Sequence, residues 1–203
     1  LGVDVKPISL RESLEWQIDT DELKRLISPK TKMIAVCHPN NPTGAVVHPE
    51  IMDEVLRLAG EIDAYVLSDE VYRGAELDGI ESPSFIGNYD KVIVNAGLSK
   101  AYRLPGLRLG WSAGPPDFIN KVWETHDYTT ISIGLLSDRI GSKILQTERR
   151  KKILSSTRNI LSENLNLLIN WVDKNSDLIS LIPPKAGAIA YLKYSMNIRS
   201  SEL

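Results

Sequence analysis

The fold is decided by residues 91–111, which read KVIVNAGLSKAYRLPGLRLGW. The apolar run Val92–Val94 predicts a buried strand, which enters a turn of small residues that displays Lys100. Arg108 follows within a second apolar run, where an unpaired charge is costly. A lysine amine at the edge of a core suggests a nucleophile, because desolvation favours its neutral form. An exposed loop lysine is the alternative, and this stretch alone leaves both open.

Composition excludes several classes of protein. The 203 residues are 42% hydrophobic and 25% charged, which is typical of one large or two small globular domains. The 24 basic and 26 acidic residues give a net charge of −2, so neither nucleic acid nor a membrane is expected as a partner. A single cysteine, Cys37, cannot form an internal disulfide, which agrees with a cytoplasmic location. The first residue is not methionine, and we expect the chain to be part of a longer protein.

Outward from residues 91–111, short apolar runs alternate with helical patterns. Strands are predicted over residues 3–8, 33–37, 64–67, 92–94, 179–182 and 188–192. Helices are predicted over residues 20–27, 49–59 and 148–174. Two more helices are expected between these last two, one that begins at residue 115 and one that Ser132 caps. Apolar strands separated by helices predict an α/β fold with a mainly parallel sheet and helices on both faces. Residues 107–111 follow too soon for a helical crossover, so they are expected to form one antiparallel strand.

The domain organisation follows from the long amphipathic stretch after residue 148. Its length suggests a connector between two domains. We expect a large cofactor-binding domain over residues 1–150, and the connecting helix with the start of a smaller α/β domain over 151–203.

Polar residues follow three successive predicted strands. Asn41 comes after the first, Asp69 and Tyr72 after the second, and Ser99 and Lys100 after the third. Each has an ordinary structural explanation when taken singly: a turn, a helix cap, a buried ring or an exposed loop. Ligands of open parallel sheets bind at the carboxyl ends of the strands, so the joint occurrence predicts a ligand site there.

Three runs carry a resemblance to a known family: NNPTG (residues 40–44), SDEVY (68–72) and LSKAYRLPGLRLGW (98–111). In order and spacing they resemble the fold-type I pyridoxal-phosphate aminotransferases, the aspartate aminotransferase superfamily, over about residues 1–195. The resemblance implies pyridoxal 5′-phosphate as the cofactor, a homodimer, and a mainly parallel sheet with one antiparallel strand.

The resemblance also implies a role for each polar residue. Lys100 resembles the lysine that holds the cofactor as an internal aldimine and then moves a proton as a base. Asp69 resembles the carboxylate that pairs with the protonated pyridine nitrogen and keeps the ring an electron sink. Tyr72 and Asn41 resemble the groups that hydrogen-bond the phenolate oxygen of the ring. The peptide before Pro42 is expected to be cis.

The cofactor phosphate is assigned in the same way. Arg108 resembles the arginine that grips the phosphate, and Ser99 is expected to add a hydroxyl. The sequence departs from the family at Gly97, which stands where a phosphate-binding serine is common, so one contact is missing or replaced. The family's phosphate-binding helix N-terminus and ring-stacking aromatic lie upstream of residue 1. Its substrate-carboxylate arginine lies beyond residue 203, and Arg199 is interpreted as a surface residue.

The resemblance implies transfer of an amino group between an amino acid and a 2-oxo acid, with no metal site. Three alternatives stay open: another pyridoxal-phosphate reaction (lyase, decarboxylase or cyclase), a non-catalytic cofactor-sensing module of a transcription regulator, or a fragment retained for folding or dimer contacts. We expect residues 1–203 alone to be inactive. The sequence does not identify which amino acid is used.

Overall fold

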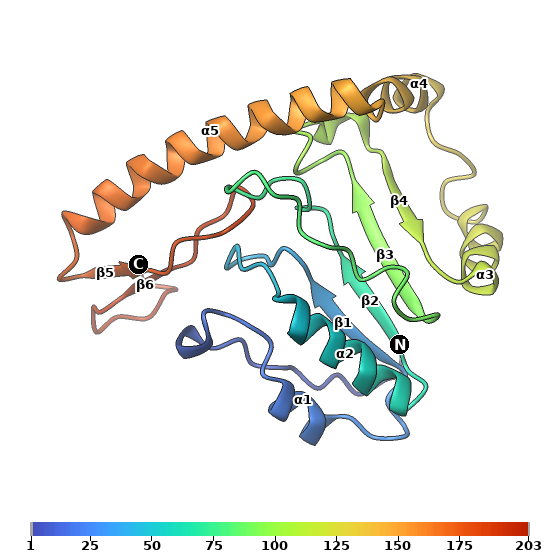
Figure 1. The fold of residues 1–203 in the computed structure, drawn as a ribbon, viewed down its shortest axis with the longest axis horizontal. Helices are drawn as coiled ribbons and strands as arrows, with labels where there is room; N and C mark the ends of the chain where they lie inside the picture. The colour runs from blue at the N-terminus through green and yellow to red at the C-terminus, as the bar shows by residue number, and fades with distance from the viewer. Residues whose placement is uncertain (1, 203) are drawn as a thin grey trace.

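The structure is a computed structural model that describes residues 2–202. Its helices, strands and 3-10 turns are, in chain order, η1 (Glu12–Leu14), α1 (Thr20–Leu26), β1 (Met33–Cys37), α2 (Pro49–Glu61), β2 (Tyr65–Asp69), β3 (Val92–Gly97), η2 (Pro105–Leu107), β4 (Gly110–Ala113), α3 (Pro116–His126), α4 (Leu135–Ile144), α5 (Thr147–Asp173), β5 (Ile179–Leu181) and β6 (Leu192–Tyr194). The long helix α5 runs from α4, beside the main sheet, to the hairpin-like pair β5 and β6 (Figure 1).

The main sheet has the order β1-β2-β3-β4 within the described residues. The first three strands are parallel, and β4 is antiparallel to β3, as predicted. Cys37, Asp69 and Asn95 lie side by side in this register, so the carboxyl ends of the parallel strands meet at one edge. The antiparallel strand begins at Gly110 rather than at residue 107, because residues 105–107 form a 3-10 turn instead.

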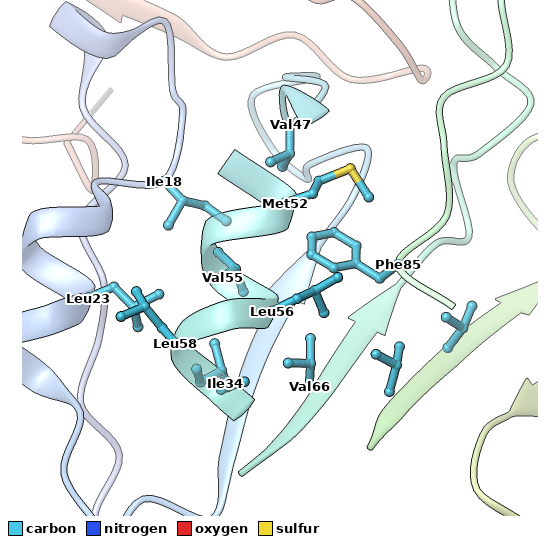
Figure 2. Close-up of a cluster of buried hydrophobic side chains, with 13 residues drawn as sticks. Ile18, Leu23, Ile34, Val47, Met52, Val55, Leu56, Leu58, Val66 and Phe85 are labelled. Carbon is cyan, nitrogen blue, oxygen red and sulfur yellow. The ribbon is translucent and has the colours of Figure 1, made fainter. Parts of the chain in front are cut away.

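The core is built on the face of the sheet that α2 covers. The buried side chains of α2 pack against β1, β2 and β3 (Figure 2); they and their neighbours include Ile18, Leu23, Ile34, Val47, Met52, Val55, Leu56, Leu58, Val66 and Phe85. Successive strand residues point to opposite faces, so Tyr65 lies on the face opposite Val66. There it contacts Phe118 of α3, with ring centroids 5.8 Å apart. Helices on both faces of the sheet are therefore confirmed.

Four local predictions are wrong. Residues 3–8 form no strand in the described chain, because the sheet does not reach them: Val3 and Val5 are 67% and 83% exposed. Gly134, not Ser132, is the N-cap of α4. Helix α2 continues to Glu61, two residues beyond its predicted end at residue 59.

The last predicted strand is also displaced: β6 begins at Leu192, where the predicted strand ends. The division into domains at residue 150 stays a prediction. None of the described helices combines the length and the apolar character that crossing a membrane requires.

Candidate functional site

A cavity of about 390 Å³ opens at the carboxyl ends of the parallel strands, within the size range of small-molecule sites. Its lining comes from all three parallel strands, the turns that follow them and the start of β4: Cys37, Asn41, Asp69, Val71, Tyr72, Ala96, Gly97, Ser99, Lys100, Arg108, Leu109 and Gly110. All six residues predicted for the site line this one cavity.

Asn41 is presented by a tightly hydrogen-bonded turn after β1. Asn40 organises it: its Oδ1 accepts hydrogen bonds from Thr43 Oγ1 at 2.8 Å and from Thr43 N at 3.3 Å. The buried ring of His38 anchors the base of the turn, because its Nδ1 accepts from Val47 N at 3.1 Å. The Asn41–Pro42 peptide is cis, as predicted.

Asp69 ends β2 and is positioned by the sheet itself. Its Oδ1 accepts a hydrogen bond from Val71 N at 3.2 Å, and the residues that follow form a turn rather than a helix. The helix-cap explanation therefore does not apply. Cys37 lies beside Asp69 in the register of β1 and β2. Burial raises the pKa of the Cys37 thiol, and the Asp69 carboxylate adds to the effect, so the thiol lining the cavity is neutral.

The Tyr72 ring is 5% exposed and packs beneath a distant segment of the chain. Gly187 has φ +82° and approaches the ring so closely that a Cβ there would lie 3.1 Å from Tyr72 Cδ1. The same segment holds the Asn41 turn, since Gly44 O accepts from the backbone N of Lys185 at 2.9 Å and of Ala186 at 3.0 Å. Residues 184–187 thus brace two of the three turns of the site.

Lys100 and Ser99 are displayed by the turn after β3. Leu98 and Ala101, on either side of them, are 0% and 1% exposed and anchor the turn in a second buried cluster. Lys100 itself is exposed in the structure, which is the second of the two alternatives that its sequence context left open. Its Nζ lies 5.8 Å from the centroid of the Tyr72 ring, which brings the two predicted catalytic groups together.

Arg108 reaches the cavity from a left-handed turn, with φ +49°, and not from a strand as the apolar run suggested. Its Nη1 donates to Pro105 O at 2.9 Å, which leaves the rest of the exposed guanidinium fork available to a ligand. Leu107 and Leu109, on either side of it, pack against the second buried cluster. Arg199 is exposed, as predicted.

Sequence reasoning missed several residues that line the cavity or contact its lining. Cys37 was considered only for disulfides, although its place at the end of the strand before Asn41 was a usable signal. Gly110 and Gly97 face each other across β4 and β3, and a Cβ at Gly97 would lie 3.1 Å from Leu109 O. No local pattern identifies Gly187, because its partner Tyr72 is more than 100 residues away.

Known proteins resemble this chain along its whole length. The sequence model of the family described as aminotransferase class I and II matches residues 1–201. The capreomycidine synthase of Streptomyces vinaceus is 27% identical over 202 residues, covering 100% of this chain and 51% of the relative. The aromatic-amino-acid aminotransferase 2 of Thermococcus litoralis is 30% identical over 187 residues, covering 90% of this chain and 48% of the relative.

A solved structure agrees with these matches. The crystal structure of a PLP-dependent aminotransferase from Streptococcus suis 89-1591 superposes with a TM-score of 0.91 at 36% identity, covering 100% of this chain and 53% of that one. The chain thus spans about half the length of the relatives it matches. It belongs to the aminotransferase class I and II family.

Proposed function

We propose that this chain carries the chemical centre of an enzyme that transfers an amino group between an amino acid and a 2-oxo acid. Membership in aminotransferase class I and II implies pyridoxal 5′-phosphate as the cofactor. The observation that carries the proposal is the convergence of Asn41, Asp69, Tyr72, Lys100 and Arg108, from four separate segments, on one cavity. The whole protein's activity and substrates are part of the proposal, because this chain spans about half of its relatives.

The chemistry around the cavity fits this cofactor. An aldehyde, a protonated ring nitrogen and a phosphate need an amine, a carboxylate and a planar cation, and Lys100, Asp69 and Arg108 supply them. Gly97 stands where the resemblance places a serine, and a Cβ at this position would be tightly packed, at 3.2 Å from Gly110 Cα. The Ser99 hydroxyl is the remaining side-chain hydroxyl for the phosphate among the described residues that line the cavity.

Each side chain has a distinct task. Pyridoxal phosphate, when bound, supplies an electron sink for the bond-breaking step. The Lys100 amine would hold the cofactor covalently and would carry the proton that the substrate loses. The Asp69 carboxylate favours a protonated ring nitrogen, and Tyr72 and Asn41 hydrogen-bond the ring oxygen. Arg108 and Ser99 hold the phosphate and so fix the orientation of the ring.

A second candidate function is a different reaction of the substrate at the same site. The match to capreomycidine synthase covers 100% of this chain, and that protein's name is not that of an aminotransferase. A lyase, decarboxylase or cyclase would use the same lysine and carboxylate. Product analysis separates the candidates, because only amino transfer converts an added 2-oxo acid into an amino acid.

The covalent bond to Lys100 is the decisive test. Borohydride reduction of the full-length protein mixed with pyridoxal phosphate should fix the cofactor on Lys100, as peptide mapping would detect. Lys100→Ala should lose the label and about 10²–10⁴-fold in turnover. Lys121→Ala, an exposed lysine of α3, is the matched control and should keep both. A label that stays in Lys100→Ala would exclude the assignment.

Asp69→Asn tests the second role. It should slow substrate proton transfer strongly while leaving the thermal midpoint close to that of the wild type, because the amide keeps the shape of the carboxylate. If Asp69 served only to accept the turn hydrogen bond from Val71 N, the variant would show the reverse: about 1 kcal/mol less stability and unchanged turnover. A homodimer, a cytoplasmic location and the inactivity of residues 1–203 alone stay predictions.

A further inference from the structure

A carboxylate outside the cavity links to the turn that carries Tyr72. Arg73 directly follows Tyr72, and its Nη1 lies 3.0 Å from Glu81 Oε1. Glu81 belongs to the loop between β2 and β3 and does not line the cavity. Arg73 is held in place by a further bond, because its Nε donates to Ser82 O at 2.7 Å. A displacement of Glu81 would therefore move Arg73, which is the residue directly after Tyr72.

The same carboxylate links to the turn that carries Lys100. Arg150, in the first turn of α5, donates from Nη2 to both oxygens of Glu81, at 2.7 and 2.8 Å. Its Nε donates to Tyr102 Oη at 2.9 Å, and Tyr102 is two residues after Lys100. The first turn of α5 lies beside α4, at one end of the main sheet (Figure 1). Glu81 thus lies between two arginines, each tied to one turn of the site.

These groups are too buried to be an ordinary surface ion pair. The side chains of Glu81, Arg150 and Arg73 are 24%, 29% and 33% exposed, and Tyr102 is 6% exposed. Burial is the largest single influence and lowers the Arg150 pKa, but the hydrogen bonds and charge interactions with Glu81 and Tyr102 together raise the pKa above its ordinary value. The guanidinium therefore stays charged. Partly desolvated, multiply bonded pairs hold geometry better than exposed ones.

Apolar packing already fixes α5 on this part of the molecule. Leu154 is 2% exposed and packs with Leu98, Ala101 and Tyr102 in the second buried cluster. The ion pairs are consequently not needed to hold the helix. Glu81 adds a second connection between the two turns, which one long backbone hydrogen bond already joins, from Ala101 N to Val71 O at 3.4 Å.

We propose that Glu81 is a positioning residue that sets the distance between the Lys100 amine and the Tyr72 ring, by bridging Arg150 and Arg73. Glu81 acts only through these arginines and touches no group in the cavity. The inference rests on the proposed function, in which Lys100 and Tyr72 act on the same bound cofactor. Loss of the bridge leaves the two turns joined less firmly, so the amine is less often in a productive position.

The experiment compares Glu81→Gln with Glu61→Gln in the full-length protein. Glu61 is an exposed partner of Arg57 in α2 and serves as the matched control. Glu81→Gln should lower kcat about 10–100-fold with an almost unchanged KM for the amino acid. It should also shift the pH midpoint of the visible absorption band formed on Lys100, which a purely structural residue would not move. Glu81→Asp, which keeps the charge, should restore part of both, and Glu61→Gln should match the wild type.

The outcomes separate the inference from the proposed function. A wild type that forms no visible band with pyridoxal phosphate would overturn both. A normal wild-type band, with Glu81→Gln within twofold of the wild-type kcat and an unshifted pH midpoint, would overturn the positioning role alone. If Glu81→Gln does not fold, Arg150→Lys replaces it under the same criteria, because an ammonium keeps the charge but cannot bond Tyr102 and both Glu81 oxygens.

Discussion

Helices α2 and α4 have the same kind of apolar periodicity and very different surroundings. In α2, the buried residues Met52, Val55, Leu56, Leu58 and Ala59 pack on the sheet (Figure 2). In α4, whose residues are all described, only Gly141 is buried, and Leu135 and Leu136 are 70% and 74% exposed. Periodicity thus predicts a helix and its apolar face, but not whether the described chain covers that face.

The largest effect on stability is expected when one leucine from each helix is replaced by alanine. Leu58→Ala removes a side chain that is 3% exposed and should lower the free energy of unfolding by about 2–5 kcal/mol. Leu136→Ala should change it by no more than about 0.5 kcal/mol. Urea unfolding of both variants measures the difference. Equal losses would mean that Leu136 is buried in solution and that the contrast between the helices is false.

A buried carboxylate gives the next effect. Glu70 is 3% exposed, and its Oε1 accepts from Ser84 Oγ at 2.9 Å and Phe85 N at 3.0 Å. Glu70→Gln should cost about 1–3 kcal/mol, because a charge-assisted acceptor becomes a neutral amide. Asp138→Asn, in the exposed first turn of α4, should cost about 0.3–1 kcal/mol through the helix dipole. A larger loss from Asp138→Asn would reverse the ranking of the two regions.

The sequence predicts the packed region well because its signals are local. Strand β1, helix α2 and the polar residues after the strands follow from periodicity, caps and position at strand ends, and all six predicted residues line the cavity. The mispredicted segment 3–8 has the same alternation as a strand. Alternation does not show whether a sheet edge is near, and among residues 2–202 no strand pairs with this segment.

Contacts between distant segments were beyond sequence reasoning. The bond from Arg150 to Glu81 joins residues 69 apart, and Gly187 meets Tyr72 across an even longer separation. Neither glycine nor arginine at those positions belongs to a local pattern. The exposure of Lys100 could not be predicted either, since it depends on how far the turn extends beyond buried Leu98 and Ala101.

A pH effect should be confined to the packed region. Burial lowers the pKa of His38 below its ordinary value of 6.5, and the nearby Glu76 and Arg73 act in opposite directions. Well above pH 6.5 the ring is neutral in both the folded and the unfolded state, so it does not make stability depend on pH. As the pH falls below 6.5, the unfolded chain takes up a proton that the folded chain resists, so stability falls by at most about 1.4 kcal/mol per pH unit.

The measurement is urea unfolding at pH 7.5 and pH 5.5 for the wild type and His38→Gln. The variant lacks the titrating ring, so it should lose less stability than the wild type between the two pH values. The same loss in both proteins would show that His38 does not resist protonation. That result would contradict its hydrogen bonds to Val47 N and Pro83 O, which require a neutral ring with Nδ1 as the acceptor.

The smallest effects compare the helix caps of the two regions. Asp19 caps α1, with Oδ1 accepting from Glu22 N at 2.9 Å, whereas α4 begins at Gly134, which has no side chain to cap with. Asp19→Ala should cost about 1 kcal/mol, because the N-terminal end of α1 loses its side-chain acceptor. Gly134→Asn should add only a few tenths of a kcal/mol to the free energy of unfolding. An asparagine fits at this position, because φ is −62° and a Cβ would lie 3.9 Å from its nearest neighbour, Ser137 Oγ. Thermal unfolding of both variants tests this, and a gain from Gly134→Asn as large as the Asp19→Ala loss would show that an uncovered helix depends on its cap as much as a packed one.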